Sequence, residues 1–296
     1  MASTANSSPP GFCKFAIPKK GRLYEKVTEL LKGAGIKYRR EPRLDVAICK
    51  DLPITLVFLP ASDIAKYVGE GNVDLGITGT DIVEESNVKV DHVMDLGFGK
   101  CKLCVQAPVS KGITDVSSLA GGRIVTSFPF LTERYFRVFD EKMGVKTKVT
   151  EVSGSVEAAC GLGLADAVVD LVETGTTMRA AGLEVVADVL TTESILISNP
   201  HSEHKEIVQL VKRRIEGQIT AQKYVMVSYN IPNIKLEAAL TITPGKKSPT
   251  ITPLYDQDYM AVSCLVENNE VAQKMDELHE LGATDILTFQ LANTRM

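Results

Sequence analysis

The stretch VDLGITGT at residues 73–80 returns as VDLVETGT at residues 169–176, with six identical residues in eight positions. Each copy ends a β-rich run and leads into a helical pattern, at a joint where Thr and Gly are favoured turn residues. In parallel α/β sheets, ligands bind beyond the carboxyl ends of the strands. The repeat therefore predicts two similar lobes whose loops line one cleft. The alternative is a chance likeness between two ordinary strand-to-helix turns.

The rest of the chain extends this interpretation. Up to about residue 199, short β-rich runs alternate with amphipathic helical segments such as residues 22–35, a pattern typical of an α/β fold with parallel strands. From residue 224 onward the order changes to strand, helix, strand, strand, helix, strand. That βαββαβ order is ferredoxin-like, a topology of many small ligand-binding modules.

These patterns predict four parts. We expect a disordered tail at residues 1–12, a first lobe built from residues 13–100 and 190–222, a second lobe at residues 101–189, and a small C-terminal domain at residues 223–296.

Composition limits the classes of function. The 296 residues include 33 Lys plus Arg against 37 Asp plus Glu, a net charge of -4, so no overall positive field would hold nucleic acid or an anionic membrane. No apolar run reaches the roughly 18 residues that a membrane span needs. The leader lacks the features of a signal or transit peptide, and we expect a cytoplasmic protein.

Six dispersed cysteines suit reduced thiols in such a compartment. Cys101 and Cys104 form a CxxC spacing, but a structural zinc site needs a second pair of ligands, and none stands at a suitable distance. The surrounding residues alternate like a strand, which would place these two thiols on opposite faces. We expect no metal site made by the protein alone.

The second copy of the repeat predicts a phosphate-binding loop at residues 173–177. Glycine lets backbone amides approach a phosphate, threonine hydroxyls add donors, and the helix that follows supplies unpaired N–H groups. The alternative is that Thr174 only caps a helix. Asp166 and Asp170 stand four apart on the preceding strand, so both carboxylates should project from one face, where they could bind ribose hydroxyls or hydrated Mg²⁺.

Two further segments point to an anionic ligand. Lys19, Lys20 and Arg22 lie at a strand-to-helix junction, where cations oppose the helix dipole and a bound polyphosphate would offset that cost. An ordinary solvated basic turn is the alternative. Glu157 opens another helix, either as part of the site or as a first-turn acid, and Phe128 could stack on a base or belong to the core. No Ser/His/Asp or Cys/His set suggests a covalent nucleophile, so we expect group transfer by orientation and electrostatics.

Six segments together resemble the ATP phosphoribosyltransferases that open histidine biosynthesis, in their long, allosteric form and of the stand-alone fungal type. The segments are AIPKKGRL (16–23), VDLGITGTD (73–81), TSFPFL (126–131), SGSVEAA (153–159), ADAVVDLVETGTTMRAAGL (165–183) and TPGKKSPTITPL (243–254). The resemblance implies a two-lobed core like that of periplasmic binding proteins and an ACT-like C-terminal regulatory domain. It also implies that N1 of ATP displaces pyrophosphate from phosphoribosyl pyrophosphate, with Mg²⁺ required and carried by the substrate.

The resemblance also assigns roles to residues. The catalytic candidates are Lys19, Arg22, Glu157, Asp166 and Asp170. The substrate-binding candidates are Gly21, Thr78, Gly79, Glu173, Thr174, Gly175, Thr176 and Thr177.

The resemblance further implies inhibition by histidine and assembly into dimers or hexamers. The histidine site would include Asn230, Thr250, Leu265 and Asp285, although some family members have Asp at the position of Asn230 and a small residue at that of Asp285. A two-lobed solute-binding protein and a non-catalytic ligand sensor are the alternatives from other classes. The first would need a signal peptide, and the second a nucleic-acid-binding element.

Overall fold

The structure is a computed structural model that describes residues 11–255 and 258–295. Of the expected disordered tail, residues 1–10 lie outside the described residues. The chain divides into two compact units, one made of residues up to 27 and residues 38–208, the other of residues 28–37 and from 209 onward. No helix among the described residues combines the length and apolar character that a membrane crossing requires.

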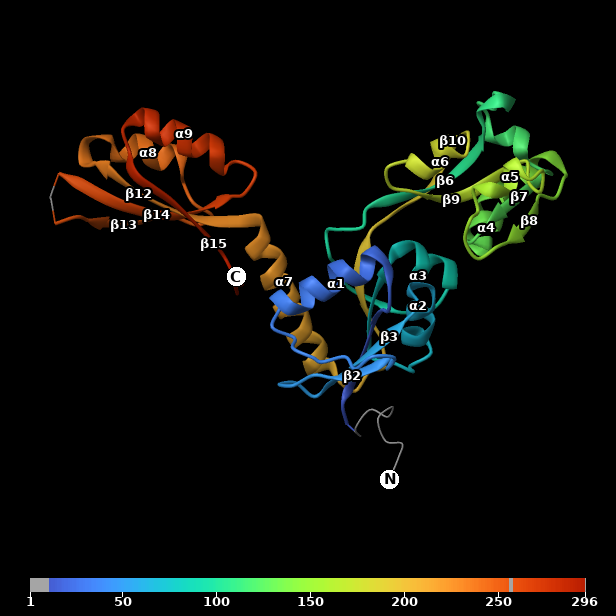
Figure 1. Ribbon diagram of the computed structural model, residues 1–296, viewed down its shortest axis with the longest axis horizontal. Coiled ribbons are helices and arrows are strands. Elements are labelled where there is room, and N and C mark those ends of the chain that lie inside the picture. The colour runs from blue at the N-terminus through green and yellow to red at the C-terminus, as the bar shows by residue number, and fades with distance from the viewer. Residues whose placement is uncertain (1–10, 256–257, 296) are drawn as a thin grey trace. The chain divides into compact units, whose positions relative to one another are not determined.

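The first unit contains two sheets, and the first of them has six strands in the order β2-β3-β1-β4-β11-β5 (Figure 1). The strands are β1 (Cys13–Pro18), β2 (Val46–Ile48), β3 (Ile54–Leu59), β4 (Leu75–Gly79), β5 (Asp91–Asp95) and β11 (Ser194–Ser198). The accompanying helices are α1 (Gly21–Gly33), α2 (Ala61–Gly69) and α3 (Thr80–Ser86). We call this sheet and its helices lobe I.

The second sheet has five strands in the order β10-β6-β9-β7-β8. The strands are β6 (Cys101–Pro108), β7 (Arg123–Thr126), β8 (Lys148–Glu151), β9 (Ala167–Val172) and β10 (Leu183–Thr192). The helices are η1 (Val109–Lys111), η2 (Val116–Leu119), α4 (Pro129–Met143), α5 (Ala158–Gly161) and α6 (Thr176–Ala180). We call this part lobe II.

The two lobes have the same topology. Apart from the short edge strand β2, lobe I reads β3-β1-β4-β11-β5 and lobe II reads β8-β7-β9-β6-β10. In each, the first three strands are parallel and the last two pair antiparallel. The two copies of the repeated sequence fall on β4 and β9, the central strand of each lobe. The two similar lobes that the repeat predicted are therefore confirmed.

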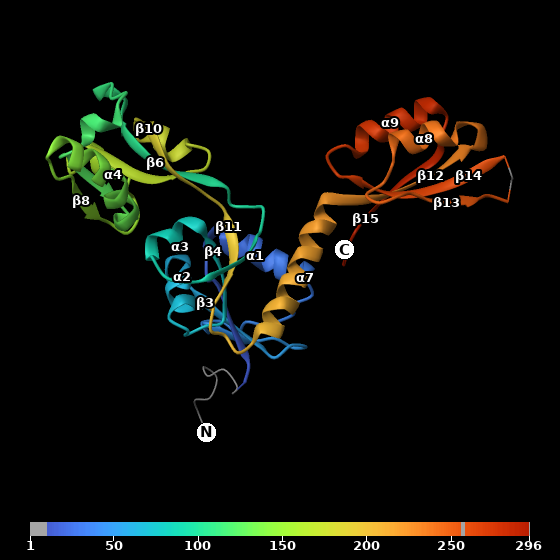
Figure 2. The same cartoon turned by 180° about the vertical axis from the view of Figure 1, so that it is seen from behind.

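The second unit contains a four-stranded antiparallel sheet in the order β13-β14-β12-β15 (Figure 2). Its elements are α7 (Lys205–Lys223), β12 (Tyr224–Pro232), η3 (Asn233–Lys235), α8 (Leu236–Ile242), β13 (Thr250–Pro253), β14 (Tyr259–Glu267), α9 (Val271–Leu281) and β15 (Thr284–Gln290). Every second residue of β12 is buried, and these residues share one core cluster with residues of α8 and α9. The predicted ferredoxin-like order is confirmed.

The boundary between the units differs from the expected one at residue 223. Most of helix α7, from residue 209 onward, and the second half of α1 belong to the C-terminal unit, because contacts far apart in sequence join them. Arg214 of α7 donates a hydrogen bond to the carbonyl of Gly35 at 3.0 Å, and Asn293 donates one to the carbonyl of Gly33 at 2.7 Å. Helical periodicity shows which face of a helix is apolar but not which partner covers it.

Candidate functional site

A cleft of about 270 Å³ is lined by residues of both lobes. Lobe I contributes Arg22 at the start of α1, Gly79 at the end of β4 and Asp81 in α3. Lobe II contributes Phe128 and Glu173, which follow β7 and β9. The cleft therefore lies beyond the carboxyl ends of parallel strands, where the duplicated loops were predicted to meet.

One ion pair joins the two predicted anion-binding segments across this cleft. Arg22 Nη1 lies 2.9 Å from Glu173 Oε2, and the two side chains are 84% and 47% exposed. Exposed pairs contribute about 1 kcal/mol or less, so an anionic ligand could displace the carboxylate from the guanidinium at little cost.

The start of α1 carries positive charge that no acidic residue of the helix itself balances. Gly21 has a φ of +84°, which favours glycine, and no acidic residue stands in the first turn of the helix. Lys20 and Arg22 are exposed and Lys19 is partly exposed. The positive end of the helix dipole and three cationic side chains thus share one turn, which matches a site for a polyphosphate.

The loop after β9 is open to solvent. Glu173, Thr174, Thr176 and Thr177 are exposed, and the hydroxyls of Thr174 and Thr176 lie 3.0 Å apart. Gly175 has a φ of +73°, and a Cβ there would lie 2.6 Å from the Arg179 guanidinium. The loop therefore presents hydroxyls around a backbone turn that only glycine accommodates without strain.

The two predicted aspartates lie at opposite ends of β9. Asp170 is near the carboxyl end, beside the loop, and its pKa is raised by burial and then by the nearby Glu157 carboxylate. Asp166 precedes the strand, about 13 Å away at 3.3 Å per residue. It accepts hydrogen bonds from the backbone N–H and the guanidinium of Arg123 at 3.0–3.2 Å. Asp166 lies outside β9, and the structure gives it a structural partner away from the loop.

Glu157 reaches this region from the segment before α5. Its charge is one of the causes that raise the pKa of Asp170, after the burial of that carboxylate. Ser155, two residues earlier, has a φ of +50°, an uncommon conformation for a residue other than glycine. Glu157 itself is the N-cap residue of α5, and its side chain makes no cap hydrogen bond to that helix.

The first copy of the repeat contributes less than predicted. Thr78 is fully buried and donates its hydroxyl to the carbonyl of Ala61 at 3.0 Å, so it holds lobe I together and has no free donor for substrate. Gly79 lines the cleft, but a Cβ there would collide with Asp81 Oδ1. The Asp81 carboxylate alone therefore explains why glycine stands at position 79, without any need for a ligand.

Asp81 is a cleft residue that sequence reasoning missed, although it ends the quoted segment VDLGITGTD. It is 5% exposed, and burial raises its pKa. Its Oδ1 accepts a hydrogen bond from Thr192 Oγ1 at 2.7 Å, and that hydroxyl also accepts one from the Asp81 N–H at 3.0 Å. Nothing in the local sequence singled it out, because its hydrogen-bond partner Thr192 lies 111 positions away.

Phe128 is a core residue that also reaches the cleft. It is 5% exposed, belongs to the lobe II core cluster and lines the cleft. Cys101 also lines the cleft, whereas the buried Cys104 donates its thiol to Asp188 at 3.4 Å. Both thiols are free, and burial raises their pKa values, to about 11 for Cys101.

A divalent metal has no complete set of protein ligands here. In residues 11–255 and 258–295, no group of three or more His, Cys, Asp or Glu side chains is arranged to hold a metal ion. Asp170 nonetheless puts a carboxylate beside the predicted phosphate loop, which fits a hydrated cation whose remaining ligands come from a substrate.

The four residues predicted to bind histidine lie on the sheet face opposite α8 and α9. Asn230 donates a hydrogen bond to Asp285 Oδ2 at 2.8 Å, and Asp285 has a φ of +51°. Thr250 pairs with Ser263 on β14, and Leu265 follows two residues later on the same face. Asn230 and Asp285 are in direct contact, whereas Leu265 is four residues along β14 from Ala261, the partner of Asn230.

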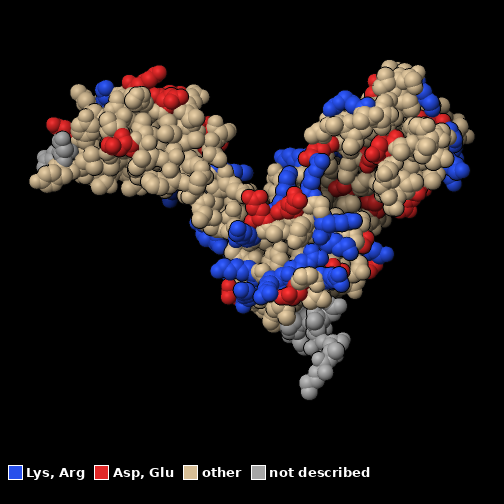
Figure 3. Space-filling model, in the orientation of Figure 1, with Lys and Arg blue, Asp and Glu red and all other residues tan. Residues whose placement is uncertain are grey.

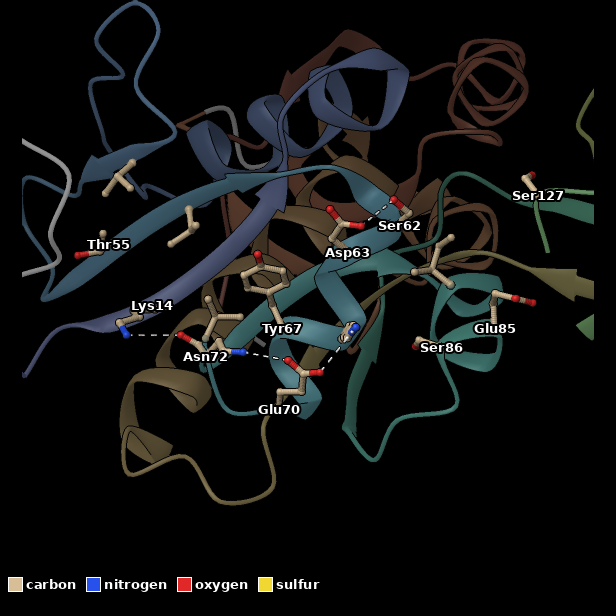
Figure 4. A pocket seen from close by; sticks show the side chains of 15 residues that line it. Lys14, Thr55, Ser62, Asp63, Tyr67, Glu70, Asn72, Glu85, Ser86 and Ser127 are labelled. Carbon is tan, nitrogen blue, oxygen red and sulfur yellow. Dashed lines mark hydrogen bonds and ion pairs between the residues drawn. The ribbon is translucent and has the colours of Figure 1, made fainter. Parts of the chain in front are cut away.

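A second groove and a gathering of basic residues also mark the surface of the protein. A larger groove of about 1060 Å³ runs along α2, with Lys14 and Asn72 at one end and Glu85 and Ser127 at the other (Figure 4), but no predicted site residue lines it. Figure 3 shows Lys and Arg gathered over the part that contains α1 and the first sheet, while the domain with α8 and α9 shows mostly uncharged surface on this face. Positive charge is thus gathered locally in a chain whose net charge is -4.

Known proteins resemble this chain along nearly its whole length. The family model described as ATP phosphoribosyltransferase matches residues 60–217, and the model described as HisG, C-terminal domain, matches residues 221–293. The ATP phosphoribosyltransferases of Yarrowia lipolytica and Saccharomyces cerevisiae are each 51% identical to it, with 95% of this chain and 96% of each relative covered.

Solved structures support the same fold. The ATP phosphoribosyl transferase (HisG:HisZ) complex from Thermotoga maritima matches with a TM-score of 0.61 and 29% identity, covering 71% of this chain and 99% of that one. A putative L-cystine ABC transporter from Listeria monocytogenes matches with a TM-score of 0.50 and 15% identity, covering 70% and 92%. The second likeness concerns the fold alone and agrees with the two-lobed core.

Proposed function

The chain belongs to the ATP phosphoribosyltransferase family, and we propose that its interlobe cleft is where the phosphoribosyl group passes from phosphoribosyl pyrophosphate to N1 of ATP. This pentosyl transfer is the first step of histidine biosynthesis. The observation that supports the location best is the Arg22–Glu173 contact, because it brings the cationic turn of lobe I to the phosphate loop of lobe II.

Lobe II would hold the phosphoribosyl group. Residues 173–177 would bind the 5-phosphate through backbone N–H groups and the hydroxyls of Thr174, Thr176 and Thr177. Asp170 would accept hydrogen bonds from the ribose hydroxyls, with Glu157 beside it. Two carboxylates next to the ribose would also stabilise the positive charge that develops at C1′ as the bond to pyrophosphate breaks.

Lobe I would face the leaving group and ATP. Lys19, Arg22 and the N–H groups after Gly21 would bind phosphates and stabilise the charge released onto pyrophosphate. The reaction needs a divalent cation, for which we propose Mg²⁺ carried by phosphoribosyl pyrophosphate, with Asp170 and Glu157 facing its water ligands. Bound Mg²⁺ would neutralise phosphate charge during the transfer.

The C-terminal domain would regulate this reaction by binding histidine. Asn230 and Asp285 would meet its polar groups, and Thr250 and Leu265 would line the same sheet face. Two features support a ligand there: the positive φ of Asp285 beside Asn230, and a sheet face that α8 and α9 leave uncovered. We also propose assembly into dimers and hexamers, as the family resemblance implies.

Release of pyrophosphate tests the catalytic proposal. Wild-type protein mixed with ATP, Mg²⁺ and phosphoribosyl pyrophosphate should release pyrophosphate and change the adenine absorbance. Asp170→Asn should lower kcat/KM at least 100-fold, and Thr174→Val about 10-fold, because each removes contacts to the phosphoribosyl group. Asp166→Asn, at the far end of the same strand, is the matched control and should retain activity per folded protein.

Two results would count against this site. Near wild-type turnover of Asp170→Asn would remove β9 and its loop from the proposal. Tight binding of both substrates by the wild type without release of pyrophosphate would favour the solute-binding alternative.

A further inference from the structure

Helices α3 and α4 belong to different lobes, and they meet beside the cleft, which Ile82 of α3 also lines. Ile82 of α3 packs against the core clusters of both lobes. Glu84 and Glu85 of the same helix reach α4. We call the contact of these three residues with α4 the interlobe contact.

Glu85 caps a helix that belongs to the other lobe. Its Oε1 accepts a hydrogen bond from the Phe130 N–H and its Oε2 one from the Leu131 N–H, each at 2.9 Å. The N-cap residue of α4, Phe128, makes no side-chain cap of its own, and Pro129 has no N–H to offer. The first turn of α4 therefore depends on a lobe I carboxylate for two of its donors.

A second charged pair flanks the first. Arg134, one turn further along α4, donates from both Nη1 and Nη2 to Glu84 Oε2 at 3.1 and 3.0 Å. Both side chains of this pair are about half exposed, whereas Glu85 is more deeply placed and its pKa is raised by burial. The Glu85 contact therefore consists of two hydrogen bonds to backbone N–H groups, whereas the Glu84–Arg134 pair is exposed enough to contribute about 1 kcal/mol or less.

Two short segments of chain connect the lobes. The chain crosses once between β5 and β6, through Gly97 and Gly99 with φ of +76° and +70°, and returns from β10 to β11 at Glu193. The two crossing segments pair with each other through Leu96, Phe98 and Ser194. Such extended segments with glycine absorb rotation easily, so contacts at the rims of the lobes decide the width of the cleft.

We propose that the interlobe contact, centred on Glu85, holds the two lobes in their cleft-forming orientation, and that releasing it lets lobe II rotate away. The inference rests on the proposed function for its kinetic readout but not for its structural one. The Arg22–Glu173 pair cannot replace this contact, because it is exposed and lies where substrate anions would compete for Arg22.

The consequence is a specific kinetic pattern. Losing a charged hydrogen bond shifts a two-state equilibrium by a factor of about 10 to 100. When a smaller fraction of the protein has a formed cleft, the apparent affinity for substrates falls by that fraction. At saturation the substrates themselves bridge the lobes, so kcat recovers.

The test compares Glu85→Gln with two other variants. Glu85→Gln keeps the size of the side chain but removes its charge and one acceptor, and it should raise the KM for both substrates at least 10-fold while kcat stays within 2-fold. Glu84→Gln removes only the outer pair and should raise KM less than 3-fold. Glu133→Gln, an exposed residue of α4, is the matched control and should behave as wild type.

Hydrogen exchange at the Phe130 and Leu131 amides gives a readout independent of activity. In wild type these amides should exchange slowly, and more slowly still with ATP, phosphoribosyl pyrophosphate and Mg²⁺ present; in Glu85→Gln they should exchange at least 10-fold faster. Unchanged exchange in Glu85→Gln, or a fall in kcat with KM unaltered, would overturn the proposal. If wild type released no pyrophosphate, the proposed function would fail while the exchange comparison still decided the contact.

Discussion

Asp166→Asn should destabilise the protein without affecting its chemistry. The carboxylate of Asp166 accepts three hydrogen bonds from Arg123, and Lys111 Nζ lies 3.5 Å from its Oδ1. These contacts join the start of β7 to the start of β9 within lobe II. Asparagine would keep one acceptor but lose the charge.

The magnitude follows from the pKa of Asp166, which hydrogen bonds from the Arg123 side chain and then its backbone N–H lower to about 2 from an ordinary value of 3.8. That difference corresponds to at most about 2.4 kcal/mol. The side chain is 34% exposed, so solvent screening reduces the expected loss to about 1 kcal/mol. For a unit of this size, the melting temperature should fall by about 2 to 4 °C.

The sign of the pH dependence is fixed by the same pKa. Because folding lowers the pKa, the unfolded chain binds the proton first, and the stabilisation is complete above about pH 4 to 5. It is lost as the pH falls through the folded value of about 2. The difference in unfolding free energy between wild type and Asp166→Asn should therefore shrink between pH 5 and pH 2.

Urea denaturation at several pH values measures this difference, and pyrophosphate release at pH 7.5 measures activity per folded protein. A variant as stable as wild type at pH 7 would refute the energetic argument. A variant that is fully folded but inactive would refute the structural role and return Asp166 to the ribose site.

Three further predictions concern the loop, the core and the metal. Gly175→Ala should raise the KM for phosphoribosyl pyrophosphate about 10-fold in steady-state kinetics, because alanine resists a φ of +73° and its Cβ would press on Arg179; an unchanged KM would place the phosphate elsewhere. Thr132→Val should leave the melting temperature within about 2 °C or raise it, since Thr132 Oγ1 is buried without a hydrogen-bond partner, and a fall of more than 5 °C in calorimetry would contradict this. EDTA should abolish pyrophosphate release while leaving the melting temperature of the substrate-free protein unchanged, because no three-ligand metal site exists among the described residues; a large fall would reveal a structural metal.

The fold was largely predictable from local patterns. The repeat at residues 73–80 and 169–176 predicted two lobes, and the order of strands and helices after residue 224 predicted the C-terminal sheet. Both signals arise from neighbours in sequence, since strand alternation and turn residues are local properties. The matching strand order of the lobes confirmed what the repeat implied.

The candidate site was predictable only in part. Arg22 and Glu173 were named from their own loops, and the structure brings them into contact. Thr78 occupies the same position of the repeat as Thr174, yet its hydroxyl donates a hydrogen bond to the Ala61 carbonyl inside lobe I. Asp81 carried no local signal, because its burial and its bond to Thr192 join residues 111 positions apart.

By itself the sequence determined the duplicated architecture and the type of residue at each strand end, because those depend on short-range periodicity and turn chemistry. Only the tertiary structure decided which of Asp166 and Asp170 lies beside the loop, how the helices divide between the units, and that Glu85 of one lobe caps a helix of the other. Hydrogen bonds and burial depend on distance in space, and a folded chain sets that distance between residues far apart in sequence.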